Sequence, residues 1–285
     1  MGLRKKLVLP HGMDILLSNP TQLGHTTGFL ALKGSQNYNL DRPGSDFDYV
    51  LYAMPTMEDL FKKQVFKDKM VQRNYGLTIE VKDFRDFPLM LDKQNITTLE
   101  LLFSTDIRYY DNPWVTRLLE MRHDIVRMNL PRFFDSAIGT AKSYFKRIEN
   151  PTPDTQHMFY KYGYNTKAVV GCARILMTVS TFARNGFTSF GHAIQFSDEA
   201  KEEMFKIRDG EYELHDIAVK LDTLFKEVEA VREKYMKNSV DELCRTMLWE
   251  FAQEAMEYHI ERLAVKKMND KMVRDYKNHD VVVRG

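Results

Sequence analysis

The sequence has few cysteines and no excess of charge of either sign. Only two cysteines occur in 285 residues, which is too few for a disulfide framework, and Cys172 and Cys244 lack the C-x-x-C spacing of a zinc site. Forty-one basic residues stand against forty acidic ones, so the chain as a whole is no polycation that could hold a long nucleic acid. Any nucleic-acid contact must come from a local patch.

Long apolar runs are also missing from the sequence. No run approaches the length of about 20 residues that a membrane span needs, and the apolar stretch near the N-terminus is too short for a signal peptide. We therefore expect a reduced, cytoplasmic protein without a membrane partner. The composition, 44% hydrophobic and 28% charged, is typical of an ordinary globular fold.

The first hundred or so residues mix strand and helix patterns. Segments 28–34 and 47–54 are short and rich in apolar and aromatic residues, with turn residues between them, and predict two strands. Residues 77–82 alternate apolar and polar side chains, which predicts a third strand. After Pro55 the pattern indicates a helix, with Leu60, Phe61 and Val65 on its apolar face.

Beyond residue 112 the sequence shows long helical periods and few strand patterns. Two apolar stripes indicate packing between antiparallel helices, and the last twenty residues are expected to form a loosely held, charged tail. The stripes comprise Ile217, Leu221, Leu224, Val228, Val231 and Tyr235, then Leu243, Met247, Phe251 and Ala255. The predicted fold class is α/β (α+β), with a small mixed β-sheet domain over 1–112 and a mostly α-helical domain over 113–285.

A pair of carboxylates stands where the strand at 47–54 begins. Asp46 and Asp48 are two residues apart, so on a strand they point to the same face. Two carboxylates in one volume repel each other unless a cation neutralises them, and oxygen ligands suit Mg²⁺, or Mn²⁺. Glu80 would supply a third oxygen ligand if its strand lies beside the first. These three residues form the predicted metal and catalytic site.

The Gly34-Ser35 pair ends the preceding predicted strand. A missing side chain at Gly34 lets backbone N–H groups approach a phosphate, and the Ser35 hydroxyl can add a donor. A phosphate-binding turn followed by metal-binding carboxylates is suited to phosphoryl chemistry in which metal stabilises both the nucleophile and the leaving group.

The segment "KGSQNYNLDRPGSDFDYVLYAMP" resembles the signature of the DNA polymerase β-type nucleotidyltransferase superfamily, an apolar strand, then G-S, a spacer and D-x-D. It most resembles the branch of nucleotidyltransferases associated with RNA repair, through "TTLELLFS" at 97–104, "KYGYNTKAVVGCARIL" at 161–176 and "IRDGEY" near Gly210. In this branch a glycine usually stands at the position of Asn39, which also tolerates a left-handed turn. Aspartate is the more usual third carboxylate, so Asp83 is an alternative to Glu80.

The resemblance implies a metal-dependent transfer of a nucleoside monophosphate from a nucleoside triphosphate, such as ATP, to an acceptor hydroxyl, with release of pyrophosphate. The acceptor is expected to be an RNA or tRNA end. Two alternatives stay open, transfer to a protein hydroxyl as in minimal toxin–antitoxin enzymes, and a non-catalytic relative that binds nucleotide or RNA. The sequence does not indicate the oligomeric state.

Basic and aromatic residues interleave in the helical half between 137 and 174. Lys167 and Arg174 are two helical turns apart and share a face. We expect Lys161, Lys167 and Arg174 to bind the triphosphate across a cleft between the two domains. With Gly34, Ser35 and, from the resemblance, Tyr38, they are the predicted nucleotide-binding residues.

Overall fold

Five strands form one mixed sheet in the first part of the chain. A computed structural model describes residues 9, 13, 14, 17, 26–65, 67–72, 76–108 and 113–283. The strand order in the sheet is β3-β4-β2-β1-β5. The strands are β1 (Thr26–Lys33), β2 (Phe47–Met54), β3 (Lys67–Gln72), β4 (Leu77–Asp83) and β5 (Ile107–Arg108).

The three strands that the sequence predicted are confirmed, whereas β3 and β5 were not anticipated. β2 is antiparallel to β1 and parallel to β4. β3 and β5 add antiparallel edges beside β4 and β1. The parallel pair matters for the site, because it brings side chains that are far apart in the sequence onto one face of two neighbouring strands.

The two faces of the sheet are covered by different parts of the chain. Tyr49, Leu51 and Ile79 point to one face, where they pack with Met13 and Leu17. Alternate residues of the same strands point to the other face, which belongs to the large hydrophobic core formed with the helices. Asp48 and Glu80 follow this second alternation and therefore lie on the helix-facing side of the sheet.

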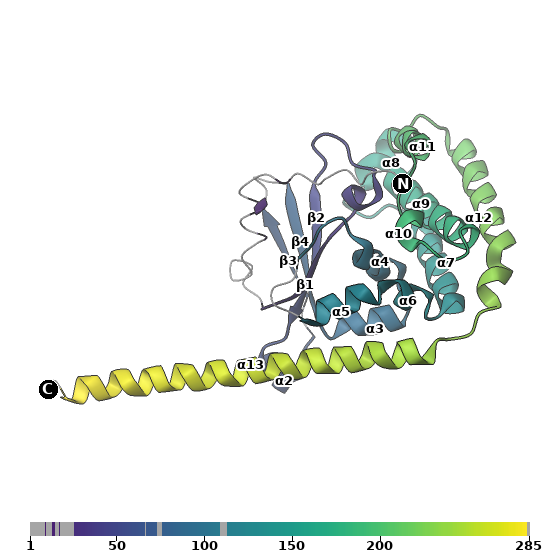
Figure 1. Cartoon of the computed structure of the whole chain (residues 1–285). Coiled ribbons are helices and arrows are strands. Elements are labelled where there is room, and N and C mark those ends of the chain that lie inside the picture. The colour runs from purple at the N-terminus through teal and green to yellow at the C-terminus, as the bar shows by residue number, and fades with distance from the viewer. Residues whose placement is uncertain are drawn as a thin grey trace.

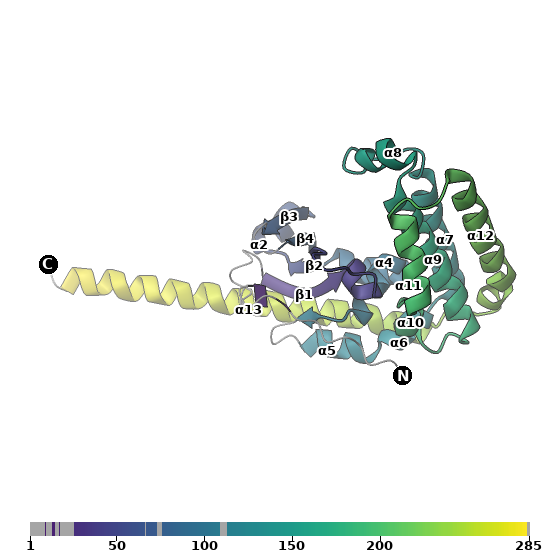
Figure 2. The ribbon, with the colours of Figure 1, turned by 90° about the horizontal axis from the view of Figure 1, so that it is seen from above.

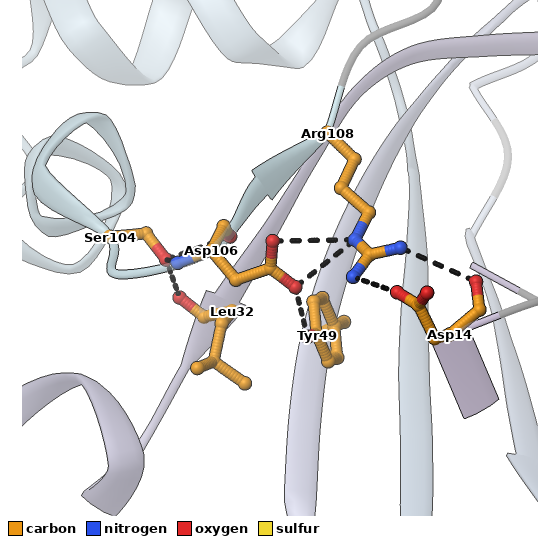
Figure 3. Close-up of polar contacts among 6 residues, drawn as sticks. All are labelled: Asp14, Leu32, Tyr49, Ser104, Asp106 and Arg108. Atoms are coloured by element: carbon orange, nitrogen blue, oxygen red, sulfur yellow. Dashed lines mark hydrogen bonds and ion pairs between the residues drawn. The ribbon is translucent and has the colours of Figure 1, made fainter. Parts of the chain in front are cut away.

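A polar network closes the first face beside β5 (Figure 3). The Tyr49 hydroxyl donates to Asp106 Oδ2 at 2.5 Å, and the Arg108 guanidinium donates to Asp106 and, at 2.8 Å, to Asp14 Oδ1. Ser104 donates from its hydroxyl to the carbonyl oxygen of Leu32 at 2.8 Å. These bonds join β1, β2 and the segment before β5. They lie on the face of β2 opposite to the one that carries Asp48.

Helices joined by turns and loops follow the sheet and form most of the second part of the described chain (Figures 1 and 2). They comprise η2 (Ser35–Tyr38), α2 (Met57–Lys62), α3 (Asp86–Asp92), α4 (Ile96–Leu99), η4 (Glu100–Phe103), α5 (Pro113–Glu120), α6 (Arg122–Arg127), α7 (Leu130–Lys146), α8 (Gln156–Tyr162), α9 (Thr166–Arg184), α10 (Phe190–Ala193), α11 (Asp198–Arg208), α12 (Leu214–Met236) and α13 (Glu242–Val283).

Helix α9 lies at the centre of the helical part, packed between α7, α11 and α12. Asn165 caps its first turn by accepting from the N–H of Ala168. In the described part of the chain, α9 is the one helix long and apolar enough to cross a membrane, but 72% of its apolar window is buried inside the protein. Its hydrophobicity is accounted for by its place in the core.

The packing of the last helices confirms one predicted stripe and corrects the other. Ile217, Leu221 and Tyr235 of α12 are buried, as expected. On α13, however, Leu243 is 72% exposed, and the buried side chain next to it is Cys244. The predicted stripe began one position too early, at Leu243 and not at Cys244, because either start fits a helical period.

Two further expectations need correction. The charged tail is helical, because α13 continues as one helix to Val283, and the tail residues up to 273 are exposed. α2 also lacks the predicted apolar face, since the helix ends at Lys62 and Phe61 is 88% exposed.

The predicted domains share one hydrophobic core. A single cluster contains Phe29 and Tyr52 of the sheet together with Phe133 and Leu176 of the helices. The predicted boundary after residue 112 falls in 109–112, outside the described residues. Because this cluster includes both sheet and helix residues, the two predicted domains are packed against each other through one core.

Candidate functional site

The turn after β1 has a backbone that only glycine adopts readily. Gly34 has φ 80° and ψ −157°, a region closed to residues with a side chain. A Cβ added at Gly34 would lie 3.4 Å from Asp48 Oδ2. The chain then makes η2, and Asn39 ends it in the left-handed conformation with φ 61°, as predicted. Gly34 thus leaves room beside the Asp48 carboxylate.

Asp46 lies just before β2 and is directed toward the start of β4. A Cβ added at Gly76 would lie 2.9 Å from Asp46 Oδ1, and Gly76 itself has φ +57°. Among the described residues, no hydrogen bond or ion pair is made by the side chain of Asp46 or Asp48. The sequence reasoning missed Gly76, which only the parallel pairing of β2 and β4 reveals.

The parallel register decides which acidic residue can be the third carboxylate. Asp48 stands opposite Thr78, and Glu80 is two positions further along β4 on the same face. Asp83 stands opposite Ala53 at the far end of the strand, fully buried and ion-paired with Arg85 at 2.6 Å. The structure therefore favours Glu80 and excludes Asp83 from this position.

Glu80 is already neutralised by lysines in this structure. Lys33 Nζ lies 2.5 Å from Glu80 Oε2, and Lys82 Nζ lies 3.2 Å from Oε1. Burial alone would raise the pKa of Glu80, but the hydrogen bond and charge of Lys33, followed by those of Lys82, lower it below its usual value. Because Lys33 is on β1 and Glu80 on β4, the lysine side chain crosses the face of β2 between them. Sequence reasoning missed Lys33, whose role depends on strand pairing.

Tyr38 and Arg174 are buried in a network with Glu100, away from solvent. The Tyr38 hydroxyl donates to Glu100 Oε2 at 2.7 Å, and Arg174 donates to Glu100 Oε1. The Arg174 guanidinium also stacks on the Tyr38 ring, 4.1 Å from its centroid. Arg174 is 5% exposed and Glu100 is 1% exposed. Direct binding of a nucleotide by Tyr38 or Arg174 is not compatible with this arrangement, and both residues instead join η2 to α9.

The pKa shifts in this network follow from burial and from the ion pair. Burial raises the pKa of Tyr38 well above its usual value, against the opposing effect of Arg174. Burial would lower the pKa of Arg174, but Glu100 and Tyr38 raise it above its ordinary value. The guanidinium stays charged and the phenol stays neutral over the physiological range.

The two predicted lysines of the helical part are exposed. Lys161 is near the end of α8, with its ammonium 4.7 Å from the centre of the Tyr162 ring, and Lys167 is in the first turn of α9. Within the part of the chain that the structure describes, neither makes a hydrogen bond or ion pair with Asp46, Asp48 or Glu80. Their proposed contact with a triphosphate stays a prediction.

The loop between η2 and β2 is attached to α11. Arg42 donates two hydrogen bonds to Asp209, at 2.7 and 2.6 Å, and stacks on Phe205. Asn39 donates to the Phe196 carbonyl oxygen at 3.1 Å and accepts from Lys201 at 3.3 Å. The segment near Gly210, quoted for its resemblance, therefore supplies a residue that positions the loop preceding the aspartates.

The donor set suits a hard divalent cation, but it is incomplete in this conformation. No group of three or more His, Cys, Asp or Glu side chains that could hold a metal is found among the described residues. Asp46 and Asp48 are oxygen donors without protein partners, whereas Glu80 must leave Lys33 before it can join them. The residues fit a metal held first by the aspartate pair.

Neither models of known protein families nor curated proteins give a match to this chain. The resemblance to nucleotidyltransferases rests on the quoted motifs and on their placement in the fold.

Proposed function

We propose that the chain is a metal-dependent nucleotidyltransferase of the cytoplasm. It would transfer a nucleoside monophosphate from a nucleoside triphosphate to a hydroxyl of an RNA or tRNA end and release pyrophosphate. The observation that carries the proposal is the position of Gly34 against Asp48. The glycine turn that ends β1 and a carboxylate without a hydrogen bond or ion pair at the start of β2 meet at one end of these strands.

The contrast with other carboxylates supports this proposal. Glu80, Asp83 and Glu100 each have a lysine or arginine partner. Among the described residues no ion pair reaches Asp46 or Asp48, and Lys33, which stands opposite Asp48 in the β1–β2 register, pairs with Glu80 instead. Like charges without a partner are unfavourable unless an external cation joins them.

Mg²⁺ or Mn²⁺, when bound, would stabilise negative charge on the attacking and leaving oxygens. The residues of the chain would do the rest. Asp46 and Asp48 would hold the ion and orient the acceptor hydroxyl, and one of their carboxylates would accept its proton. The hydroxyl oxygen then forms the new bond to the α-phosphorus while the bond to pyrophosphate breaks. The backbone N–H groups after Gly34 would bind the departing phosphates. Glu80 would complete the metal ligands on release from Lys33.

The test is incubation of the full chain with each labelled triphosphate, Mg²⁺ and total RNA or cell-lysate protein. We expect labelled RNA, and Asp48→Asn should reduce the labelling about a hundredfold or more. Asp216→Asn, at an exposed position of α12, is the matched control and should retain activity. Label in the protein fraction would instead support a protein hydroxyl as the acceptor.

A second measurement separates binding from turnover. Mg²⁺ should raise the melting temperature of the wild-type protein, and Asp46→Asn with Asp48→Asn should abolish that response. A metal response without labelling of any fraction would support the non-catalytic alternative. An equal response in the double variant would remove the aspartates from the proposed site.

A further inference from the structure

The second half of α13 extends beyond the rest of the molecule (Figures 1 and 2). α13 contains 42 residues, which corresponds to about 63 Å of helix. Its first half packs on α3, α5 and α6. His259, the last buried side chain between residues 242 and 273, donates to the Pro55 carbonyl oxygen at 2.7 Å. Every residue from 264 to 273 is exposed. We call residues 262–283 the arm.

The arm carries apolar side chains on one face. Val265, Met268 and Met272 are 56%, 65% and 61% exposed, and their spacing of three and four residues places them on one side of a helix. Tyr258, seven residues before Val265, continues this stripe and is 37% exposed. A helix that extends into water gains little stability by itself, so an apolar stripe along it indicates a partner.

Charge is divided between the two halves of the helix. Residues 242–261 contain five glutamates and one arginine, whereas the arm contains six basic and three acidic residues. A second copy of α13 that ran parallel would set acidic against acidic and basic against basic. A second copy that runs antiparallel would set each arm against the acidic half of the other.

We propose that two copies of this chain pair through an antiparallel contact between their α13 helices. The stripe fixes the register. Tyr258 and Met272 are each seven residues from Val265, so a twofold axis at Val265 places Tyr258 of one copy opposite Met272 of the other. Glu257 and Glu261 then lie beside the basic residues of the other arm. This pairing does not depend on the proposed function.

A nucleic acid is the other class of partner that a basic helix could bind, but the position of the arm disfavours it. His259 contacts Pro55, which follows the end of β2, whereas Asp48 lies near its beginning. The six residues from Asp48 to Met54 span about 20 Å of strand. An acceptor bound on the arm would therefore lie at the opposite end of the sheet from the aspartates.

The experiment uses two charge variants of the full chain, Glu257→Lys with Glu261→Lys, and Lys267→Glu with Lys271→Glu. Analytical ultracentrifugation should show a wild-type dimer and at least about tenfold weaker self-association for each variant, because each then sets like charges together. An equimolar mixture of the two variants should restore the dimer, because the changed halves complement each other. Circular dichroism checks that the helix content is unchanged.

The stripe and the orientation have their own tests. Met268→Lys should weaken the dimer, whereas Met268→Leu should leave it intact. A Tyr258→Cys chain mixed with a Met272→Cys chain should form a disulfide between copies under mild oxidation, while Tyr258→Cys alone should not. Cys172 and Cys244 are buried and serve as the unreacted background.

Three results would overturn the proposal. They are a wild-type monomer at all concentrations, a mixture of charge variants that stays monomeric, and cross-linking of Tyr258→Cys with itself, which indicates a parallel pair. Loss of RNA binding in Lys267→Glu with Lys271→Glu, from a protein that is monomeric throughout, would identify the arm as a nucleic-acid surface instead.

Discussion

Glu100, which contacts η2, and the aspartates at the start of β2 have very different surroundings. Glu100 is 1% exposed, and Arg174 and Tyr38 satisfy both of its carboxylate oxygens. Asp46 and Asp48 lie at the start of β2, the central strand, where Asp46 is exposed and Asp48 half-buried, and within the described chain neither side chain makes a hydrogen bond or ion pair. A buried charge must be paired for the fold to be stable. Two like charges near the surface repel each other, but solvent screens the repulsion, so the pair is tolerated and stays free to bind a cation.

The largest effect should come from breaking the buried pair. Arg174→Met leaves the Glu100 carboxylate buried without its cation, and we expect the free energy of unfolding to fall by about 3–5 kcal/mol. Urea unfolding followed by circular dichroism measures this. Arg174→Met with Glu100→Leu should recover part of the loss. A single-variant loss below about 1 kcal/mol, the value of an exposed pair, would contradict the assigned role of Glu100.

Tyr38→Phe should have a smaller effect on the same carboxylate. The change removes one hydrogen bond and leaves Arg174 in place, so the expected loss is about 1–3 kcal/mol in the free energy of unfolding. Tyr160→Phe, at a residue that is 77% exposed, is the matched control and should change nothing. Because the Tyr38 hydroxyl is buried against Glu100, nucleotide affinity should change little if the folded fraction is kept constant.

His259 extends the comparison to a buried group that has only a backbone partner. Burial, and then the charge of Arg262, lower the pKa of His259 below its usual value of 6.5, although the Pro55 carbonyl opposes this. The unfolded chain therefore binds a proton more readily than the folded one. Stability should be full above pH 6.5 and decline as the pH falls below it.

Thermal unfolding between pH 7.5 and 5 measures this decline. His259→Gln should flatten the pH dependence, and His157→Gln, at an exposed position, should leave it as in the wild-type protein. An unchanged slope in His259→Gln would show that other groups cause it.

The smallest effect on stability is expected for the two aspartates at the start of β2. Asp46→Asn with Asp48→Asn, measured without divalent metal, should leave the free energy of unfolding unchanged or raise it slightly, because repulsion between like charges is relieved. A substantial loss in the same urea titration would place these aspartates with Glu100 among the residues that hold the fold together.

Much of the fold was readable from local patterns, and much of the site was not. The alternation around Ile79 and the turn at Asn39 depend on near neighbours, so the sequence predicts them. Local patterns do not predict the partner of Arg174. A basic residue on a mostly apolar helix can face a cleft or a buried carboxylate, and the fold places Glu100 beside it. The Lys33–Glu80 pair likewise depends on strand order.

The failed predictions have the same origin. Phe61 is apolar and fits a helical face, but no element covers that side of α2 in the described structure. α13 was missed as a long helix because a highly charged segment gives a weak amphipathic pattern by itself.

The Tyr38–Glu100–Arg174 network also has a consequence for how the protein is made. Ribosomal synthesis completes Glu100 well before Arg174, which follows it by 74 residues. Until α9 has emerged and docked, η2 is held by the bonds of Asn37 to the Glu100 and Thr105 backbone, and Glu100 must stay hydrated. The turn before the aspartates therefore gains the Arg174 contact only after α9 exists, and a shortened chain that ends after the sheet would lack the Arg174–Glu100 pair.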